Sequence, residues 1–325
     1  MRLPAICIPL VLVLGLAACG GGGSSGSSVF APPPGANSLI YVTDSGNAIL
    51  EFNSTANGNV SPVAQITGNS TGLNSAAAIA RDSSGRIFVA QQNENQVLAF
   101  SQNITGNASP IVNIQGGNTQ LSTPTGLAFD SSGRLFVANA GTSAITIYAP
   151  NATGNVVPVA VISGNSTGLN VPAGLGFDAS GNLYVSNYAA NSVTVYAAAT
   201  LTGNVAPLRT VSGAATGLNG PASLFVSAGN VYVSNAGGNS ITIFLTTANG
   251  NVAPATTISG SSTNLAVPEG IYVDSTGKMY VANFNTPGLS GFILVFAAGS
   301  SGNAIPSQVI GGSNTGLYGT VGISL

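Results

Sequence analysis

Most of the residues that could do chemistry in this chain are amides and hydroxyls rather than charged groups. The sequence has no histidine, and charged side chains make up 4% of its 325 residues. An acid or an amide stands three residues after an aromatic residue at the ends of six similar apolar runs. These residues are Asp44, Gln91, Asn139, Asn187, Asn235 and Asn283. Such side chains either hydrogen-bond the backbone of a local turn or, when gathered in one place, bind a neutral polar ligand.

Three aromatic residues stand out beside this set. Tyr188 and Phe284 each follow one of the asparagines directly, and Tyr318 lies in the last loop of the chain. The other copies have Ser45, Gln92, Ala140 and Ala236 after the polar residue. Aromatic rings next to amides are typical of sugar and peptide sites, although loop aromatics also occur without any ligand. Tyr188, Phe284 and Tyr318 are therefore candidate ligand-binding residues together with the six polar residues.

The composition excludes several kinds of chemistry. Without histidine there can be no Ser–His–Asp triad and no histidine acid–base catalysis, and a zinc site is disfavoured. The formal net charge is −2 and no basic run occurs, which argues against nucleic-acid binding. Three acid–base pairs span tight turns and predict weak surface ion pairs. They are Asp82 with Arg86, Asp130 with Arg134, and Asp274 with Lys278.

A repeat must position these residues. Residues 124–171 divide into four short apolar runs bounded by Gly, Asn, Asp and Ser, which predicts four strands and no amphipathic helix. A Gly-Asn pair with proline three residues after the Asn marks six copies, spaced by 47 to 52 residues. The glycines are Gly58, Gly106, Gly154, Gly203, Gly250 and Gly302. A period near this length with four strands is typical of a propeller blade.

The two ends of the repeat region favour a closed ring over an open stack. The first copy begins at residues 39–42 with the second strand of the repeat, and residues 320–325 match a first strand that leads no further copy. An open stack would need capping repeats with polar outer faces. We therefore predict an all-β, six-bladed β-propeller over residues 38–325, with four antiparallel strands per blade and closure by the C-terminal strand. The repeated prolines are expected within the fourth, outer strand of each blade.

The N-terminal segment predicts export. Residues 1–18 contain Arg2 and an apolar run that is too short to span a bilayer comfortably, and they end in Leu-Ala-Ala before Cys19. This resembles the lipobox of bacterial lipoproteins, which implies cleavage before Cys19, lipid attachment to Cys19, and the outer membrane or cell surface as the location. An ordinary secretory signal cut at the same place is the alternative. Residues 19–37, rich in Gly, Ser and Pro, are expected to be a flexible tether.

A family resemblance covers the repeat region. The pattern Pro-x-Gly-Leu-x-Phe-Asp-x-x-Gly-x-Leu-Phe-Val-x-Asn is best seen in residues 124–139, 172–187 and 268–283. It resembles the NHL repeat of six-bladed propellers and, more loosely, the TolB-like superfamily. Residues 183–187 also resemble YVTN-type surface propellers. These folds host hydrolases, lyases and pure binding modules, so the resemblance implies the fold and leaves the function open.

The resemblance also implies which face carries function. In such propellers this is the face formed by the loops after the second and fourth strands, here named the top; the bottom holds the turns after the first and third strands. Related six-bladed lactonases bind a divalent cation, so Glu269, Asn283 and Asp44 are candidate Ca²⁺ ligands. A metal-dependent hydrolase or lactonase is thus the alternative function. Six near-uniform copies favour a non-catalytic binding or scaffold propeller without a cofactor. Its partner would be a protein, peptide or glycan, and only the lipid anchor would touch the membrane.

Overall fold

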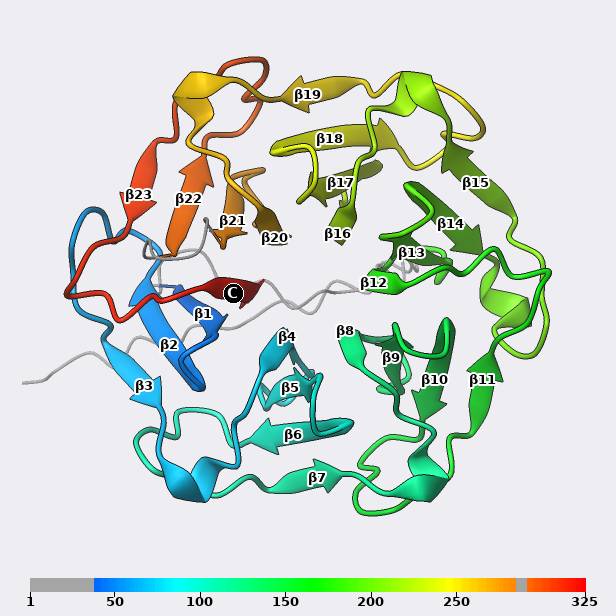
Figure 1. Ribbon diagram of the computed structural model, residues 1–325, viewed down its shortest axis with the longest axis horizontal. Helices are drawn as coiled ribbons and strands as arrows, with labels where there is room; N and C mark the ends of the chain where they lie inside the picture. Colours follow the sequence, from blue (N-terminus) through cyan, green and yellow to red (C-terminus); the bar gives the residue numbers. More distant parts are fainter. Residues whose placement is uncertain (1–37, 285–290) are drawn as a thin grey trace, which may run out of the picture.

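The computed structural model describes residues 38–284 and 291–325, which form six four-stranded antiparallel sheets around a central axis (Figure 1). The innermost, first strands are β24 (Thr320–Ser324), β4 (Ala76–Arg81), β8 (Pro124–Phe129), β12 (Pro172–Phe177), β16 (Pro221–Ser227) and β20 (Pro268–Val273). The second strands are β1 (Leu39–Asp44), β5 (Ile87–Gln91), β9 (Leu135–Asn139), β13 (Leu183–Asn187), β17 (Asn230–Asn235) and β21 (Met279–Asn283). The predicted six-bladed β-propeller is confirmed.

The third strand of each blade is buried like the second, whereas the fourth, outermost strand is shorter and more exposed. The third strands are β2 (Ala48–Asn53), β6 (Gln96–Phe100), β10 (Ala144–Tyr148), β14 (Ser192–Tyr196), β18 (Ser240–Leu245) and β22 (Phe292–Phe296). The fourth strands are β3 (Ala64–Ile66), β7 (Val112–Ile114), β11 (Ala160–Ile162), β15 (Arg209–Ser212), β19 (Thr256–Ile258) and β23 (Gln308–Ile310). Short 3₁₀ helices span Asn69–Thr71, Gly117–Thr119, Ala198–Thr200, Ala214–Thr216 and Ser261–Thr263. Within the described residues no helix is long and apolar enough to cross a membrane.

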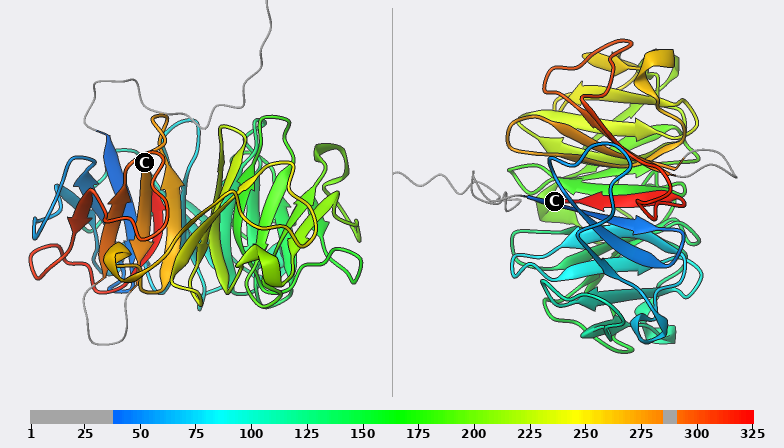
Figure 2. Two further views of the ribbon diagram at one scale, coloured as in Figure 1. Left: turned by 90° about the horizontal axis from the view of Figure 1, so that it is seen from above. Right: turned by 90° about the vertical axis from the view of Figure 1, so that its left-hand side faces the viewer.

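The C-terminal strand closes the ring, as predicted. Strand β24 pairs antiparallel with β1, with Ile323 opposite Val42, and completes the sheet β24-β1-β2-β3. Because the two strands are antiparallel, Leu39 and Leu325 lie at the same face of the disc, the bottom (Figure 2). The top face, with the loops that follow β1, β5 and their equivalents, is on the other side.

The Gly-Asn pairs fasten each blade to the one before it. The Gly106 N–H donates to the Gln65 carbonyl at 2.7 Å, which forms a short parallel bridge to the outer strand β3. The Asn107 side-chain oxygen accepts the Ser70 N–H at 2.7 Å. Six such bridges run around the rim, and the one at Gly58 joins the first blade to the last. The outer strands therefore do not end in open edges at these points.

The prolines lie just before the outer strands, not within them as we expected. Pro62 precedes β3, and the next residue, Val63, makes the first ladder bond by donating its N–H to the Glu51 carbonyl at 2.8 Å. Four of the other copies repeat this bond, at Ile111, Val159, Leu208 and Ser307. Proline, which has no N–H, thus occupies the position where the ladder has not yet begun.

The apolar core lies between neighbouring blades. Phe136 and Tyr148, aromatic residues of a second and a third strand, are both fully buried. Phe177 on β12 packs edge-on against Phe136 of the preceding blade, with ring centroids 4.9 Å apart. Phe129 and Phe88 repeat this contact at 4.9 Å one blade earlier. Such aromatic pairs add specific geometry to the apolar area that they bury.

The charged turns on the bottom face match the prediction in two cases of three. Arg86 and Asp82 form an ion pair at 2.6 Å, and Arg134 and Asp130 form one at 2.7 Å. In the third turn the Lys278 side chain instead donates to the Gln308 side-chain oxygen at 3.2 Å, while the Asp274 carboxylate accepts the Lys278 backbone N–H at 3.0 Å. In all three turns the aspartate accepts the backbone N–H of the residue four positions later, so the turn is held whether or not the side chains form an ion pair.

Candidate functional site

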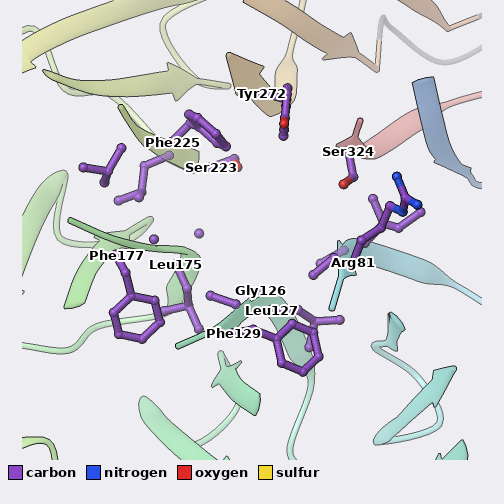
Figure 3. Close-up of a pocket in the computed structure, with 18 of the residues that line it drawn as sticks. Arg81, Gly126, Leu127, Phe129, Leu175, Phe177, Ser223, Phe225, Tyr272 and Ser324 are labelled. Carbon is purple, nitrogen blue, oxygen red and sulfur yellow. The ribbon is translucent and has the colours of Figure 1, made fainter. Parts of the chain in front are cut away.

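A channel of about 1660 Å³ runs between the six inner strands. Its walls combine apolar side chains, among them Leu127, Leu175 and Phe225, with nearly as much polar surface (Figure 3). The hydroxyl groups of Tyr272 and Ser324 face the open space in the same view. A concave site with apolar walls and polar groups in reach can hold a small molecule.

The inner strands approach one another closely toward the top of this channel. A Cβ atom added to Gly126 on β8 would overlap the carbonyl oxygen of Ala173 on β12, and one added to Gly174 would lie 2.6 Å from the Leu224 nitrogen. Glycine is therefore required by the close approach of two backbones at these positions. The glycine in the repeated Pro-x-Gly pattern is thus explained by the close packing of neighbouring inner strands.

Next to these glycines the ladder between first and second strands shifts register, as between Pro268 and Gly270. The residue at the shift lines the channel in all six blades. These residues are Ala77, Thr125, Ala173, Ala222, Glu269 and Val321. Five are small or apolar, and Glu269 alone is charged. It is partly exposed, and desolvation raises the pKa of its carboxyl to about 7.

The six polar residues at the ends of the second strands are all completely buried: Asp44, Gln91, Asn139, Asn187, Asn235 and Asn283. Each side-chain oxygen accepts backbone N–H groups from the loop that enters its blade. Asn139 accepts the Ser122 N–H at 2.9 Å and donates to the Thr146 hydroxyl at 3.0 Å. Asp44 accepts the Tyr318 and Gly319 N–H groups, both at 2.9 Å. Of the two roles that the sequence left open for these residues, these hydrogen bonds correspond to the backbone one: the buried set fastens the top loops to the strands.

The three aromatic candidates lie on the top face but not in one cluster. The exposed fractions are 44% for Tyr188 and 74% for Tyr318, and Phe284 is partly exposed. The rings of Phe284 and Tyr318 lie against Gly319 and Gly46, respectively, where blades six and one meet. Tyr188 lies two blades away beside Gly220, at the channel.

A second cavity, here named the top-face hollow, was not predicted. Its volume is about 400 Å³, and it lies on the top face beside Ala77 and Val321 of the channel wall. Its polar and aromatic lining consists of Ser45, Asn47, Asn74, Ser75, Gln92, Asn93 and Phe284, with no charged side chain. The only sequence signal was that Gln92 and Phe284 differ from the alanines at the equivalent positions of other blades.

Two of the amides in the top-face hollow are held in place by neighbours. The Asn47 side-chain oxygen accepts the Ser75 N–H at 3.0 Å, and the Asn74 side-chain nitrogen donates to a Glu94 carboxylate oxygen at 2.7 Å. These bonds use one end of each amide. The ends that these two bonds do not occupy are the NH₂ group of Asn47 and the oxygen of Asn74.

The candidate Ca²⁺ ligands do not fit a calcium site. Both Asp44 carboxylate oxygens accept backbone N–H groups, the second from Gly46 at 2.8 Å, and the Asn283 oxygen accepts the Ala266 N–H at 2.8 Å. Within residues 38–284 and 291–325, no three His, Cys, Asp or Glu side chains are grouped closely enough to hold a metal ion. Calcium needs six to eight oxygen ligands, and here Glu269 would be left to supply them almost alone.

Comparison with known proteins agrees with this architecture. The family model of the LpqB lipoprotein β-propeller domain matches residues 51–173, and that of the seven-bladed lactonase propeller matches residues 174–292. The chain is a β-propeller. It has six blades where the lactonase model has seven, and each match covers less than half of it. Neither model is that of the NHL repeat, so that resemblance stays a prediction from the sequence.

Several solved structures share the fold at low sequence identity. A Bacteroides caccae protein of unknown function is 14% identical over 88% of this chain and 97% of that chain, with a TM-score of 0.63. A chain of a nidogen–laminin complex is 15% identical over 88% and 98%, with a TM-score of 0.60. An inactive histidine-to-alanine variant of virginiamycin B lyase from Staphylococcus aureus, solved with quinupristin, is 13% identical over 80% and 82%, with a TM-score of 0.53. A search of curated protein sequences found no significant match.

Proposed function

We propose that this propeller is a non-catalytic binding protein that takes an uncharged polar partner, a glycan or a peptide, in the top-face hollow. One observation carries the proposal: the hollow combines four amides and two serines with the Phe284 ring and has no charged side chain in its lining. Sugars and peptide backbones present neutral donors and acceptors beside apolar faces, which such a lining complements.

The contacts of the hollow support a prepared site. Asn47 and Asn74 are already oriented by Ser75 and Glu94, so binding would cost little side-chain entropy for these two amides. The Phe284 ring, packed against Gly319, offers a fixed apolar surface. Tyr318 packs on Gly46, which lies between two residues of the lining, and extends the aromatic surface outward. The buried ring of Asp44 and its five equivalents holds the loops that carry these groups.

Catalysis is less well supported. The variant of virginiamycin B lyase that lacks one histidine is described as inactive, and this chain has no histidine at all. The metal-dependent lactonase alternative needs a cluster of oxygen ligands, and the two candidates besides Glu269 use their oxygens for backbone N–H groups. The lactonase match to residues 174–292 keeps a test for turnover worthwhile.

We also propose that the protein is an exported lipoprotein anchored through Cys19. Residues 1–18, the tether at 19–37 and Cys19 lie outside the described residues, so the proposal rests on the Leu-Ala-Ala-Cys sequence. The match to a lipoprotein propeller domain supports export as a lipoprotein. An outer-membrane or cell-surface location follows from the lipobox resemblance alone.

The decisive experiment is a glycan and peptide array probed with the wild type and with three alanine variants. Alanine already stands at the equivalent positions 140 and 236, so Gln92→Ala, Phe284→Ala and Tyr188→Ala should all keep the fold. We expect binding to weaken about tenfold or more in Gln92→Ala and Phe284→Ala, and to persist in Tyr188→Ala, the matched control away from the hollow. Absence of binding, or equal binding by all variants, would overturn the proposal. Turnover of a lactone or ester panel would favour the enzyme instead.

A further inference from the structure

Glu269 lies in the channel, outside the top-face hollow, and its charge is unusual there. At the equivalent positions the other blades have Ala77, Thr125, Ala173, Ala222 and Val321, all of which line the same channel. The fold therefore does not need a carboxyl group at this position. A carboxylate removed from water is costly unless something compensates it, so its presence calls for a partner.

The strands around Glu269 supply no such partner. Strand β20 packs against β16, β17, β21 and β24, and none of these contains Asp, Glu, Lys or Arg. Their titratable groups are Tyr232 on β17 and Tyr280 on β21, with Tyr272 on β20 itself. Burial raises the pKa of Tyr272 and Tyr280, so these two phenols are neutral near pH 7. Among the described residues, Glu269 is thus a carboxyl group with no ion-pair partner.

The other charged residues of the channel wall lie at its bottom end. They are Arg81, Asp82, Asp130, Arg134, Asp178 and Asp274. Two of the acids form ion pairs, Asp82 with Arg86 and Asp130 with Arg134. They sit at the turns after the first strands, whereas Glu269 is the second residue of β20, near the top. The channel therefore has a single carboxyl group close to its top mouth, and its other charged groups, in ion pairs or not, lie at the bottom.

We propose that the upper channel binds an organic monocation, a primary ammonium group on an apolar body, with Glu269 as its counter-ion. A single carboxylate matches one positive charge and accepts charge-assisted hydrogen bonds from an ammonium group. A divalent cation would need several oxygen ligands in addition. The apolar body would lie along the channel wall, where Phe225 and Tyr272 form an aromatic pair with ring centroids 4.7 Å apart. The ammonium group can come from a free amine or from a lysine side chain.

The test is calorimetric titration of the full propeller with hexylammonium, and with hexanol and hexanoate as neutral and anionic controls of equal length. We expect hexylammonium to bind most tightly, with affinity falling about tenfold or more in Glu269→Gln and Glu269→Ala. Alanine stands at this position in three other blades, so Glu269→Ala should fold, which a thermal melt checks. Hexanol binding should be the same in all three proteins. Titration with a lysine-containing peptide and with the same peptide carrying norleucine shows whether the ammonium group can be a lysine side chain. Tighter binding of the lysine peptide would show that it can, and equal binding would favour a free amine.

The pH dependence gives a second readout. Ammonium binding needs the ionised carboxyl, so the affinity of the wild type should rise between pH 5.5 and 8.5 and that of Glu269→Gln should stay flat. Hexylammonium that binds no more tightly than hexanol, or equally well to Glu269→Gln, would refute the proposal. Phe284→Ala should leave this binding unchanged, so the outcome is independent of the top-face hollow.

Discussion

The backbone N–H of Gly58, in the first blade, donates to the carbonyl of Val309, in the last blade, at 2.7 Å. Farther in, β24 pairs with β1. The first blade is thus joined to the C-terminal part of the chain at two places: at the rim through Gly58, and beside the channel through β24. A ring closed in this way leaves neither the inner edge of β1 in the first blade nor the outer strand β23 of the last blade without a partner.

Removal of residues 320–325 should destabilise the protein strongly. The deletion exposes the inner edge of β1 and removes the buried side chains of Ile323 and Leu325. Their burial alone is worth about 3–6 kcal/mol, so we expect a large fall in the denaturant midpoint or loss of the fold. A Gly-Ser extension after Leu325 is the control and should leave the midpoint unchanged. A truncated protein as stable as the wild type would contradict closure by β24.

Gly126→Ala should be destabilising where Gly117→Ala is not. A Cβ atom at Gly126 overlaps the Ala173 carbonyl, whereas one at Gly117 meets no atom within 4 Å. Overpacking against a backbone that cannot retreat costs about 1–3 kcal/mol. Chemical denaturation of the two variants side by side measures the difference, and equal stability would show that the inner strands can separate at no cost.

A buried polar cluster between blades one and two should be replaceable by apolar residues. Arg81 lies over the Tyr41 ring, with its Cζ atom 4.8 Å from the centroid, where Phe129 and its equivalents pack on aromatic rings. Glu51 beside it is 3% exposed, and burial raises the pKa of its carboxyl. Among the described residues, Glu51 Oε1 and Arg81 Nε are buried without hydrogen-bond partners.

We therefore expect the double variant Glu51→Ile/Arg81→Phe to be more stable than the wild type by about 1–3 kcal/mol, because apolar packing replaces imperfectly paired buried charges. Isoleucine and phenylalanine occupy these positions in other blades, as at Ile147 and Phe129. Arg81→Phe alone should destabilise, since it leaves the Glu51 carboxylate without its neighbouring cation. Differential scanning calorimetry at neutral pH decides, and a double variant that melts below the wild type would count against this reading.

Glu269 should make stability depend on pH. The pKa of its carboxyl is raised by burial from 4.5 to about 7, so the folded state binds the proton more tightly than the unfolded state does. Its contribution is fully present below pH 4.5 and is lost as the pH rises to 7, a difference of roughly 1–3 kcal/mol. Glu269→Gln should remove that part of the decline in unfolding free energy between pH 5 and pH 8. Parallel pH profiles for the two proteins would mean that the carboxyl is better solvated than the structure indicates.

Cys19→Ser should release the protein from membranes. If Cys19 carries lipid, the wild type partitions into the detergent phase and the variant into the aqueous phase, because acyl chains supply most of the membrane affinity. Detergent phase separation of both proteins, expressed with the natural leader, is the measurement. Aqueous partitioning of the wild type would favour an ordinary secretory signal.

Much of the fold could be read from the sequence because each blade repeats the same few constraints. The Gly-Asn pairs marked the blades because glycine and asparagine together make the rim bridges, as at Gly106 and Asn107. The missing first strand of blade one predicted β24 correctly. The site was harder to predict. Asn139 and its equivalents could serve a ligand or a loop, and only their burial shows that the loop accounts for their hydrogen bonds.

The top-face hollow could not be predicted because it is built from loops of three blades that are distant in sequence. Asn47, Asn74 and Phe284 come from blades one, two and six, and nothing in a single copy shows that they are neighbours. The family resemblance grouped Glu269 with Asp44 and Asn283 as candidate Ca²⁺ ligands. Their hydrogen bonds to backbone N–H groups separate them from it.

The chain enters and leaves the disc on the bottom face, at Leu39 and Leu325. If Cys19 is the anchor, the chain that leads to it joins the disc on the bottom face, and the top-face hollow and the Glu269 end of the channel lie on the face opposite this point of attachment. Extended partners such as polysaccharide chains or the surface of another cell could then reach these sites without crossing the lipid headgroups. The direction of the first strand thus keeps the point of attachment and the candidate sites on opposite faces of the disc.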